Sequence, residues 1–138
     1  MRFVVFVKAN GESESGAMPD KKALMDMQEF NQKLADAGVM LAGEGLLPSS
    51  KGARIAFRNG TPKVSDGPFA ETKELVAGYW LLEAKSKAEA IDWMTKAPFQ
   101  DGELEIRQIS EGEEFAYAPE VMEQDKKLRA QIAQQHRS

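Results

Sequence analysis

The sequence has no cysteine and only one histidine, His136, which lies close to residue 138. Without cysteine the chain can form no disulfide, no thiolate nucleophile and no cysteine-ligated zinc or iron–sulfur centre. Serine catalysis would also lack a histidine base within the main part of the chain. A cysteine-free composition is typical of a reducing compartment, so we expect a cytoplasmic protein.

Long apolar runs and long basic runs are missing too. The apolar run at residues 3–7 is too short for the core of a signal peptide or for a membrane span, so we expect no membrane insertion. The net charge is −4, and an acidic chain is a poor partner for nucleic acid, whose binding depends on neutralising phosphates. No spaced set of histidines and carboxylates predicts a metal or another cofactor, although a carboxylate-only magnesium site stays open.

What is present is typical of one globular domain: 138 residues, 42% of them hydrophobic and 29% charged. Apolar periodicity, helix caps and the turn signal Asn59-Gly60 predict its elements. The expected strands are 3–7, 39–42, 53–58, 61–65, 76–84 and 103–109, the expected helices are 20–37 and 86–97, and residues 9–17 are expected to form a flexible loop. This order predicts an α+β fold, a ferredoxin-like βαβ-βαβ plan with an inserted β-hairpin.

We therefore expect one α+β domain over residues 1–110 and a C-terminal helical extension over residues 111–138. A helix is predicted from Pro119 to Gln135, but Val121, Leu128 and Ile132 give it only a thin apolar stripe. Such an appendage is suited to docking on a partner protein.

Residues 66–74 read Asp-Gly-Pro-Phe-Ala-Glu-Thr-Lys-Glu, and this segment resembles the hallmark of the DGPF branch of the YCII-related family. Residues 37–46 and 76–81 are also similar to segments of that family, so that the resemblance covers roughly residues 1–109. It implies a homodimer in which two sheets face each other as an α+β barrel, with a cleft near the hallmark loop. It implies no settled reaction, and some members are partners or fusions of sigma-factor-like regulators.

The chain departs from the wider family at one pair of positions. YCII-type proteins carry a histidine early in the first helix region and an aspartate before a proline after the second helix. Here residues 18–37 contain no histidine, and Ala97 precedes Pro98. The proposed catalytic dyad of the family therefore cannot be carried over.

The hallmark segment supplies the candidate site residues. In the functional interpretation, Asp66 or Glu71 acts as general base and Lys73 binds an anion. In the structural interpretation, Asp66 accepts hydrogen bonds from backbone amides, Gly67 takes a positive φ, Pro68 fixes the next φ and Phe69 plugs the core. The remaining candidate ligand-binding residues are Glu44, Thr72 and Tyr79.

Tyr79 and Trp80 must point to opposite faces of their strand. One is expected to enter the core beneath the helices, and the other to face the interior of the barrel between subunits. Either aromatic could stack on a ligand or serve only for packing.

Three functions are consistent with these features. The first is an enzyme or ligand-binding protein that binds or transforms a small polar molecule near the hallmark loop. The alternative is a non-catalytic dimer that acts as an interaction or regulatory accessory protein through its C-terminal helix. A dimer whose ligand site has decayed is the third.

Overall fold

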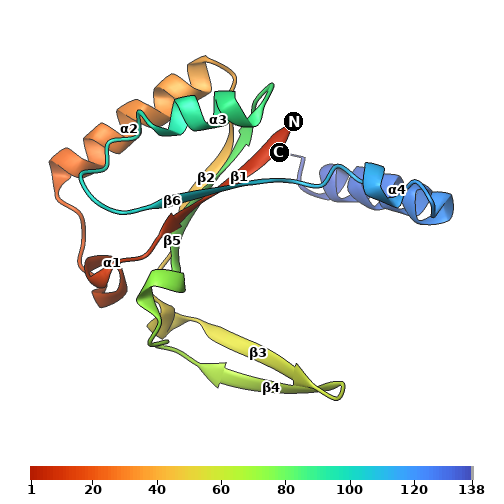
Figure 1. Cartoon of the computed structure of the whole chain (residues 1–138), viewed down its shortest axis with the longest axis horizontal. Coiled ribbons are helices and arrows are strands. Elements are labelled where there is room, and N and C mark those ends of the chain that lie inside the picture. Colours follow the sequence, from red (N-terminus) through yellow and green to blue (C-terminus); the bar gives the residue numbers. More distant parts are fainter. Residues whose placement is uncertain (138) are drawn as a thin grey trace. The chain divides into compact units, whose positions relative to one another are not determined.

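The computed structural model describes residues 1–137, with the side chain of Lys73 excepted (Figure 1). The chain divides into two compact units, Met1–Gln108 and Ile109–Ser138, which are described separately below.

The first unit is built on a four-stranded sheet whose neighbouring strands are all antiparallel, in the order β2-β5-β1-β6. The strands are β1 (Arg2–Lys8), β2 (Met40–Gly45), β5 (Val76–Glu83) and β6 (Leu104–Gln108). Helices α2 (Lys21–Asp36) and α3 (Lys87–Met94) form the two crossovers (Figure 1). This is the ferredoxin-like α+β topology, and the predicted fold class is confirmed.

Alternation along the central strands separates a core face from an open face. Phe3 and Val5 of β1 pair with Leu82 and Trp80 of β5, and all four side chains are buried. Phe30 and Leu34 of α2 and Ala90 and Met94 of α3 pack in the same core, together with Val39 and Ala84. Both helices therefore pack on one face, and the other face carries Val4, Phe6, Tyr79 and Leu81.

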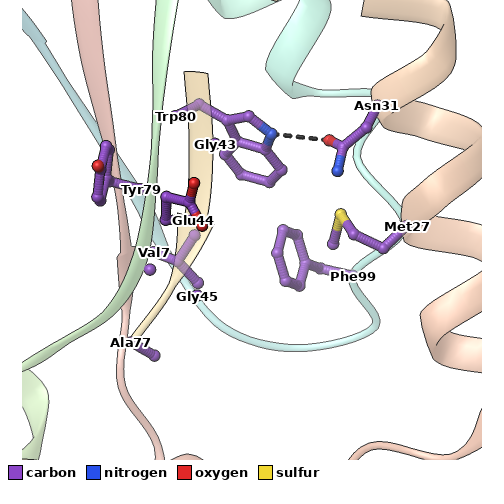
Figure 2. A pocket seen from close by; sticks show the side chains of 11 residues that line it. Val7, Met27, Asn31, Gly43, Glu44, Gly45, Ala77, Tyr79, Trp80 and Phe99 are labelled. Carbon is purple, nitrogen blue, oxygen red and sulfur yellow. Dashed lines mark hydrogen bonds between the residues drawn. The ribbon is translucent and has the colours of Figure 1, made fainter. Parts of the chain in front are cut away.

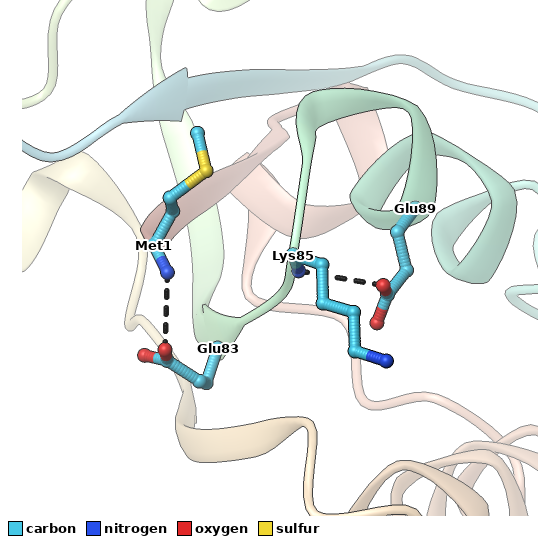
Figure 3. Close-up of polar contacts among 4 residues, drawn as sticks. All are labelled: Met1, Glu83, Lys85 and Glu89. Carbon is cyan, nitrogen blue, oxygen red and sulfur yellow. Dashed lines mark hydrogen bonds and ion pairs between the residues drawn. The ribbon is translucent and has the colours of Figure 1, made fainter.

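The two crossover helices, α2 and α3, begin at side-chain caps. The Asp20 carboxylate accepts a hydrogen bond from the Ala23 amide at 2.8 Å, and the Ser86 hydroxyl accepts one from the Glu89 amide at 3.1 Å. The Glu89 carboxylate accepts from the Lys85 amide at 3.3 Å, one residue before the N-cap (Figure 3). A predicted strand thus passes directly into a predicted helix at this point.

The inserted hairpin is a separate two-stranded sheet of β3 (Ala53–Arg58) and β4 (Thr61–Asp66). Asn59 and Gly60 join the strands with φ of 51° and 78°, as a two-residue turn of this kind requires. All residues of both strands are exposed. The 3₁₀ turns η1 (Ser49–Lys51) and η2 (Thr72–Glu74) lie on either side of the hairpin in the sequence.

Two local predictions were wrong. Residues 9–17 are not a flexible loop throughout, because α1 (Gly11–Ser15) forms there. Asn10 accepts a hydrogen bond from the Ser13 amide at 2.8 Å, and the Ser13 hydroxyl accepts one from the Asn10 amide at 2.9 Å. The strand predicted over residues 39–42 is also longer, since β2 continues to Gly45 and places Glu44 inside the sheet.

A β-bulge lies between Met40 and Ala42 in the pairing of β2 with β5. Met40 is opposite Leu82, yet Ala42 is opposite Leu81, so Leu41 is the extra residue. Beyond the bulge, Gly43 is opposite Trp80 on the core face and Glu44 is opposite Tyr79 on the open face.

The second unit holds η3 (Glu113–Phe115) and α4 (Pro119–Gln135), and α4 has the bounds that the sequence predicts. Its apolar residues Val121, Leu128 and Ile132 are exposed. A hydrogen bond from the Ser110 hydroxyl holds the pKa of the Glu114 carboxyl below its usual value. Among residues 1–137, no helix has both the length and the apolar character needed to cross a membrane.

Candidate functional site

A pocket of about 230 Å³ lies between α2 and strands β2 and β5, and we call it the Trp80 pocket. Its floor is sheet backbone, and its walls are side chains from α2, from β5 and from the loop after α3 (Figure 2). The lining residues are Val7, Met27, Asn31, Gly43, Glu44, Gly45, Ala77, Gly78, Tyr79, Trp80 and Phe99.

The floor is bare because two glycines face each other there. Gly45 of β2 is opposite Gly78 of β5, and Gly78 is in turn opposite Val7 of β1. A Cβ built on Gly78 would lie 2.9 Å from the Glu44 carbonyl oxygen, so this position leaves no room for a side chain. A Cβ on Gly45 would have no other atom within 4 Å, which shows that open space lies above it.

Aromatic rings form the main wall. The Trp80 ring meets the rings of Phe30 and Phe99 edge to face, with centroids 5.9 and 6.3 Å away. Its indole Nε1 donates a hydrogen bond of 2.8 Å to the Asn31 Oδ1 (Figure 2). Because Oδ1 is the acceptor, the Asn31 Nδ2 remains as the amide donor on the pocket side. The pocket is therefore largely apolar, with one oriented polar group.

Two of the predicted ligand-binding residues, Glu44 and Tyr79, border this pocket. They are directly opposite each other in the sheet, next to the Gly45–Gly78 pair. Strand alternation directs both side chains toward the open face. In Figure 2 the Tyr79 ring lies on the other side of the strand from Trp80. Trp80 is thus the aromatic that enters the core, as one of the two was predicted to do.

The other predicted site residues do not line the pocket. Asp66 ends β4 opposite Ala53 and is exposed, and Glu71 is exposed just before η2. Thr72 begins η2 and is half-buried. The side chain of Lys73 lies outside the part of the chain that the structure describes. The candidate bases and the Trp80 pocket are therefore in different places.

The hallmark glycine has a different role from the one predicted. Gly67 is not among the glycines with positive φ, so that part of the interpretation was wrong. A Cβ on Gly67 would lie only 1.8 Å from the Ser49 carbonyl oxygen, and the Gly67 amide donates to the Gly52 carbonyl at 3.1 Å. Glycine is required because two backbone segments touch at the root of the hairpin.

The hallmark phenylalanine also differs from the prediction, because Phe69 is half-buried and lies outside the hydrophobic core. Its ring is covered by the Arg54 guanidinium, 3.9 Å from the ring centroid. Its amide donates to the Ser49 hydroxyl at 3.0 Å. Among the described residues, the Asp66 carboxylate forms none of the backbone hydrogen bonds expected of it.

Ser49 ties the hallmark to the N-terminal part of the chain. Its amide and its hydroxyl both donate to the Glu14 carboxylate, at 3.0 and 2.5 Å. The same hydroxyl accepts the bond from Phe69, so α1, η1 and the hallmark meet at one serine. Sequence reasoning missed Ser49 and Glu14, which are 35 residues apart, because no local pattern links them.

Sequence reasoning also missed Met27, Asn31 and Phe99 as pocket residues. Met27 is an apolar residue of α2, and Asn31 lies one turn beyond it on the same side of the helix. A polar residue that interrupts an apolar helix face is a usable indication, in the sequence alone, of a polar group in a pocket. Phe99 carries no such signal, since it follows Pro98 in an irregular segment.

Nothing in the described part of the chain forms a metal site, because no group of three or more histidine, aspartate or glutamate side chains converges there. The Trp80 pocket has one carboxylate, Glu44, at its edge. What the pocket offers chemically is shape, aromatic surface and an amide donor.

The fold and the site together define a ferredoxin-like α+β subunit with a small apolar pocket beneath its first long helix. The family model described as the YCII-related domain matches residues 1–113. An uncharacterized protein of Rhizobium meliloti (strain 1021) is 31% identical over 107 residues, which make up 73% of this chain and 86% of that protein. The chain belongs to the YCII-related family.

A solved structure with a similar fold is that of 5-chloro-2-hydroxyhydroquinone dehydrochlorinase from Burkholderia phenoliruptrix AC1100, in complex with 2,5-dihydroxybenzoquinone. The similarity has a TM-score of 0.47 at 13% sequence identity, and it covers 83% of this chain and 98% of that chain.

Proposed function

We propose that this protein binds a small, flat, uncharged molecule in the Trp80 pocket. The observation that carries the proposal is the bare Gly45–Gly78 floor beneath an aromatic wall. A flat molecule lies against exposed sheet backbone where no Cβ intervenes, and its edge meets the rings of Trp80 and Phe99. The volume of about 230 Å³ is below the usual range of roughly 300–1,000 Å³ for drug-sized ligands, which favours a small one.

The Asn31 amide defines the polar part of the ligand. Its Oδ1 is held by the Trp80 indole, so its Nδ2 donates to the ligand, which therefore carries an acceptor such as a carbonyl oxygen. Charged ligands are disfavoured because the wall side chains carry no charge and desolvating an ion there is costly.

The lining favours binding over acid–base catalysis. Glu44 is the carboxylate at the pocket edge, and a proton transfer on a bound molecule would depend on it. Catalysis by Asp66 or Glu71 and ligand contacts by Thr72 or Lys73 remain separate proposals, because none of these residues lines the pocket.

A leucine at position 45 tests the proposal, since its side chain would fill the open space above the floor. With benzamide as a flat, neutral probe, we expect wild type to show a shift of the Trp80 indole N–H resonance on binding. In Gly45→Leu the affinity should fall at least about tenfold, which corresponds to roughly 1.4 kcal/mol.

Gly11→Leu is the matched control, because a Cβ at Gly11 also meets no atom within 4 Å but lies in α1, outside the lining. It should bind benzamide as wild type does. Equal binding by Gly45→Leu, or no benzamide-induced shift in wild type, would contradict the proposal.

The predicted homodimer is proposed to form through the open face of the sheet. Two rows of side chains cross this face, Ala42–Leu81–Val4–Arg107 and Glu44–Tyr79–Phe6–Glu105. Each row is apolar or aromatic at its centre and charged at one or both ends, the pattern of an interface core with a polar rim. A barrel of two such sheets would cover both apolar centres.

Phe6→Asp should therefore convert the dimer into a monomer, because it buries an unpaired carboxylate in the centre of the interface. Sedimentation velocity at micromolar concentration measures the change. Met18→Asp, at an exposed methionine outside the sheet, should leave the dimer intact. A wild-type chain that sediments as a monomer would refute the dimer.

The second candidate function is that of an interaction or regulatory accessory protein. It is favoured by the exposed stripe of Val121, Leu128 and Ile132 along α4, which suits helix docking on another protein. Membership of the DGPF branch and a cytoplasmic location stay predictions from the sequence.

A further inference from the structure

We propose that the β3–β4 hairpin is a second self-association surface, which packs against the same hairpin of another copy of this chain around a two-fold axis. The proposal is independent of the Trp80 pocket and of the open sheet face, because it rests on the two faces of the hairpin itself.

The hairpin has one apolar face and one basic face. Directly paired residues share a face, so Ile55 with Val64 and Phe57 with Pro62 make an apolar surface that Ala53 extends toward the root. The rungs between them carry the positive charges on the other face: Arg54 opposite Ser65, Ala56 opposite Lys63 and Arg58 opposite Thr61.

The apolar face is uncovered in the single chain. Ile55, Phe57 and Val64 are 59%, 72% and 64% exposed. On the basic face Arg54 already covers the ring of Phe69 at the root. A two-stranded ribbon alone is marginally stable in water, and stability requires that an apolar face pack against another element. The face in need of a partner is therefore the one that carries Ile55, Phe57 and Val64.

The charges along the hairpin favour a second copy as that partner. Asp66 lies at the root on the apolar side, opposite Ala53, whereas Arg58 and Lys63 lie toward the tip. When two copies stack with their strands reversed, the root of each lies over the tip of the other. The two β4 strands lie over each other, so the Asp66 carboxylate then lies near the Lys63 side chain of the other copy, which is long enough to reach around the β4 edge of the ribbon. The contact is formed twice, as two-fold symmetry demands.

This arrangement fixes which residues meet. The two-fold axis runs across the central apolar rung, so Ile55 faces Ile55 of the other copy and Val64 faces Val64. Ala56 is one rung away and points to the opposite face, so the two Ala56 side chains are separated by both ribbons.

The natural absence of cysteine makes a crosslinking experiment clean. Ile55→Cys and Ala56→Cys in the full chain each carry a single thiol, on opposite faces of the hairpin. Under a mild oxidant at micromolar concentration, we expect Ile55→Cys to form a disulfide dimer at least about ten times faster than Ala56→Cys. Equal rates, or no covalent dimer of Ile55→Cys, would overturn the proposal. The apolar face of the hairpin would then not pack against a second copy, whether or not a different protein covers it.

Charge reversal gives a second readout on the Ile55→Cys background. Asp66→Lys should slow crosslinking, Lys63→Asp should slow it as well, and the two together should restore the rate, because the pair is exchanged between copies. A double variant as slow as its slower parent would overturn the proposed geometry. Benzamide binding is the control, since none of these changes touches the Trp80 pocket.

Discussion

Replacing Trp80 with alanine is expected to lower the free energy of unfolding by about 3–5 kcal/mol, the usual cost of removing a buried aromatic ring. The Trp80 side chain is only 4% exposed and contacts the rings of Phe30 and Phe99. Its loss also leaves the Asn31 Oδ1 without its donor. Urea denaturation followed by circular dichroism measures the change.

Trp93→Ala is the matched comparison, because Trp93 is half-buried and its described ring contact is with Lys96, 5.2 Å from the ring centroid. This variant should lose clearly less stability than Trp80→Ala. Trp80→Phe should keep much of the packing but release the Asn31 amide. The loss in free energy of benzamide binding should therefore exceed the loss in free energy of unfolding. If both alanine variants lost the same free energy of unfolding, Trp80 would not be a central residue of the core.

Gly67→Ala is expected to cost about 1–3 kcal/mol or more, because a Cβ would lie 1.8 Å from the Ser49 carbonyl oxygen and the backbone must move. The movement separates η1 from the hallmark and breaks the hydrogen bond from the Phe69 amide to Ser49. Amide hydrogen exchange at Phe69 and across the hairpin should therefore become faster.

Gly52→Ala is the control at the same root, since its Cβ would lie 3.6 Å from the same carbonyl oxygen, an ordinary contact. It should change stability and exchange little. If both variants behaved alike, the close approach at Gly67 would not be the reason for glycine in the hallmark segment.

Local patterns were enough to predict the fold. The apolar runs of β1 and β5, the caps at Asp20 and Ser86 and the Asn59-Gly60 turn each act within a few residues. Their order then selects the ferredoxin-like topology, because consecutive elements connect in few ways. The α1 helix was missed because its glycine and serines are typical of a loop, and only the reciprocal Asn10–Ser13 cap reveals it.

The candidate site was predictable only in part. Glu44 and Tyr79 were predicted because each is next to a glycine in the sequence. The pocket itself depends on contacts between segments that are distant in the sequence. Asn31 meets Trp80 across 49 residues, and the Ser49–Phe69 bond spans 20. No periodicity encodes such contacts. The candidate bases were chosen from the carboxylates of the hallmark segment, Asp66 and Glu71. In the structure its glycine and phenylalanine, Gly67 and Phe69, make the contacts at the root of the hairpin.

The bulge at Leu41 decides the chemistry of the pocket. With that extra residue, Gly43 and Gly45 reach the core face opposite Trp80 and Gly78, and Glu44 faces the other way. If Leu41 were instead paired regularly with Leu81, every later residue of β2 would move one place along β5, and Glu44 would lie opposite Gly78 on the pocket floor. The bulge thus separates a site suited to neutral molecules from an acidic one suited to cations, although the residues of β2 are the same in both registers.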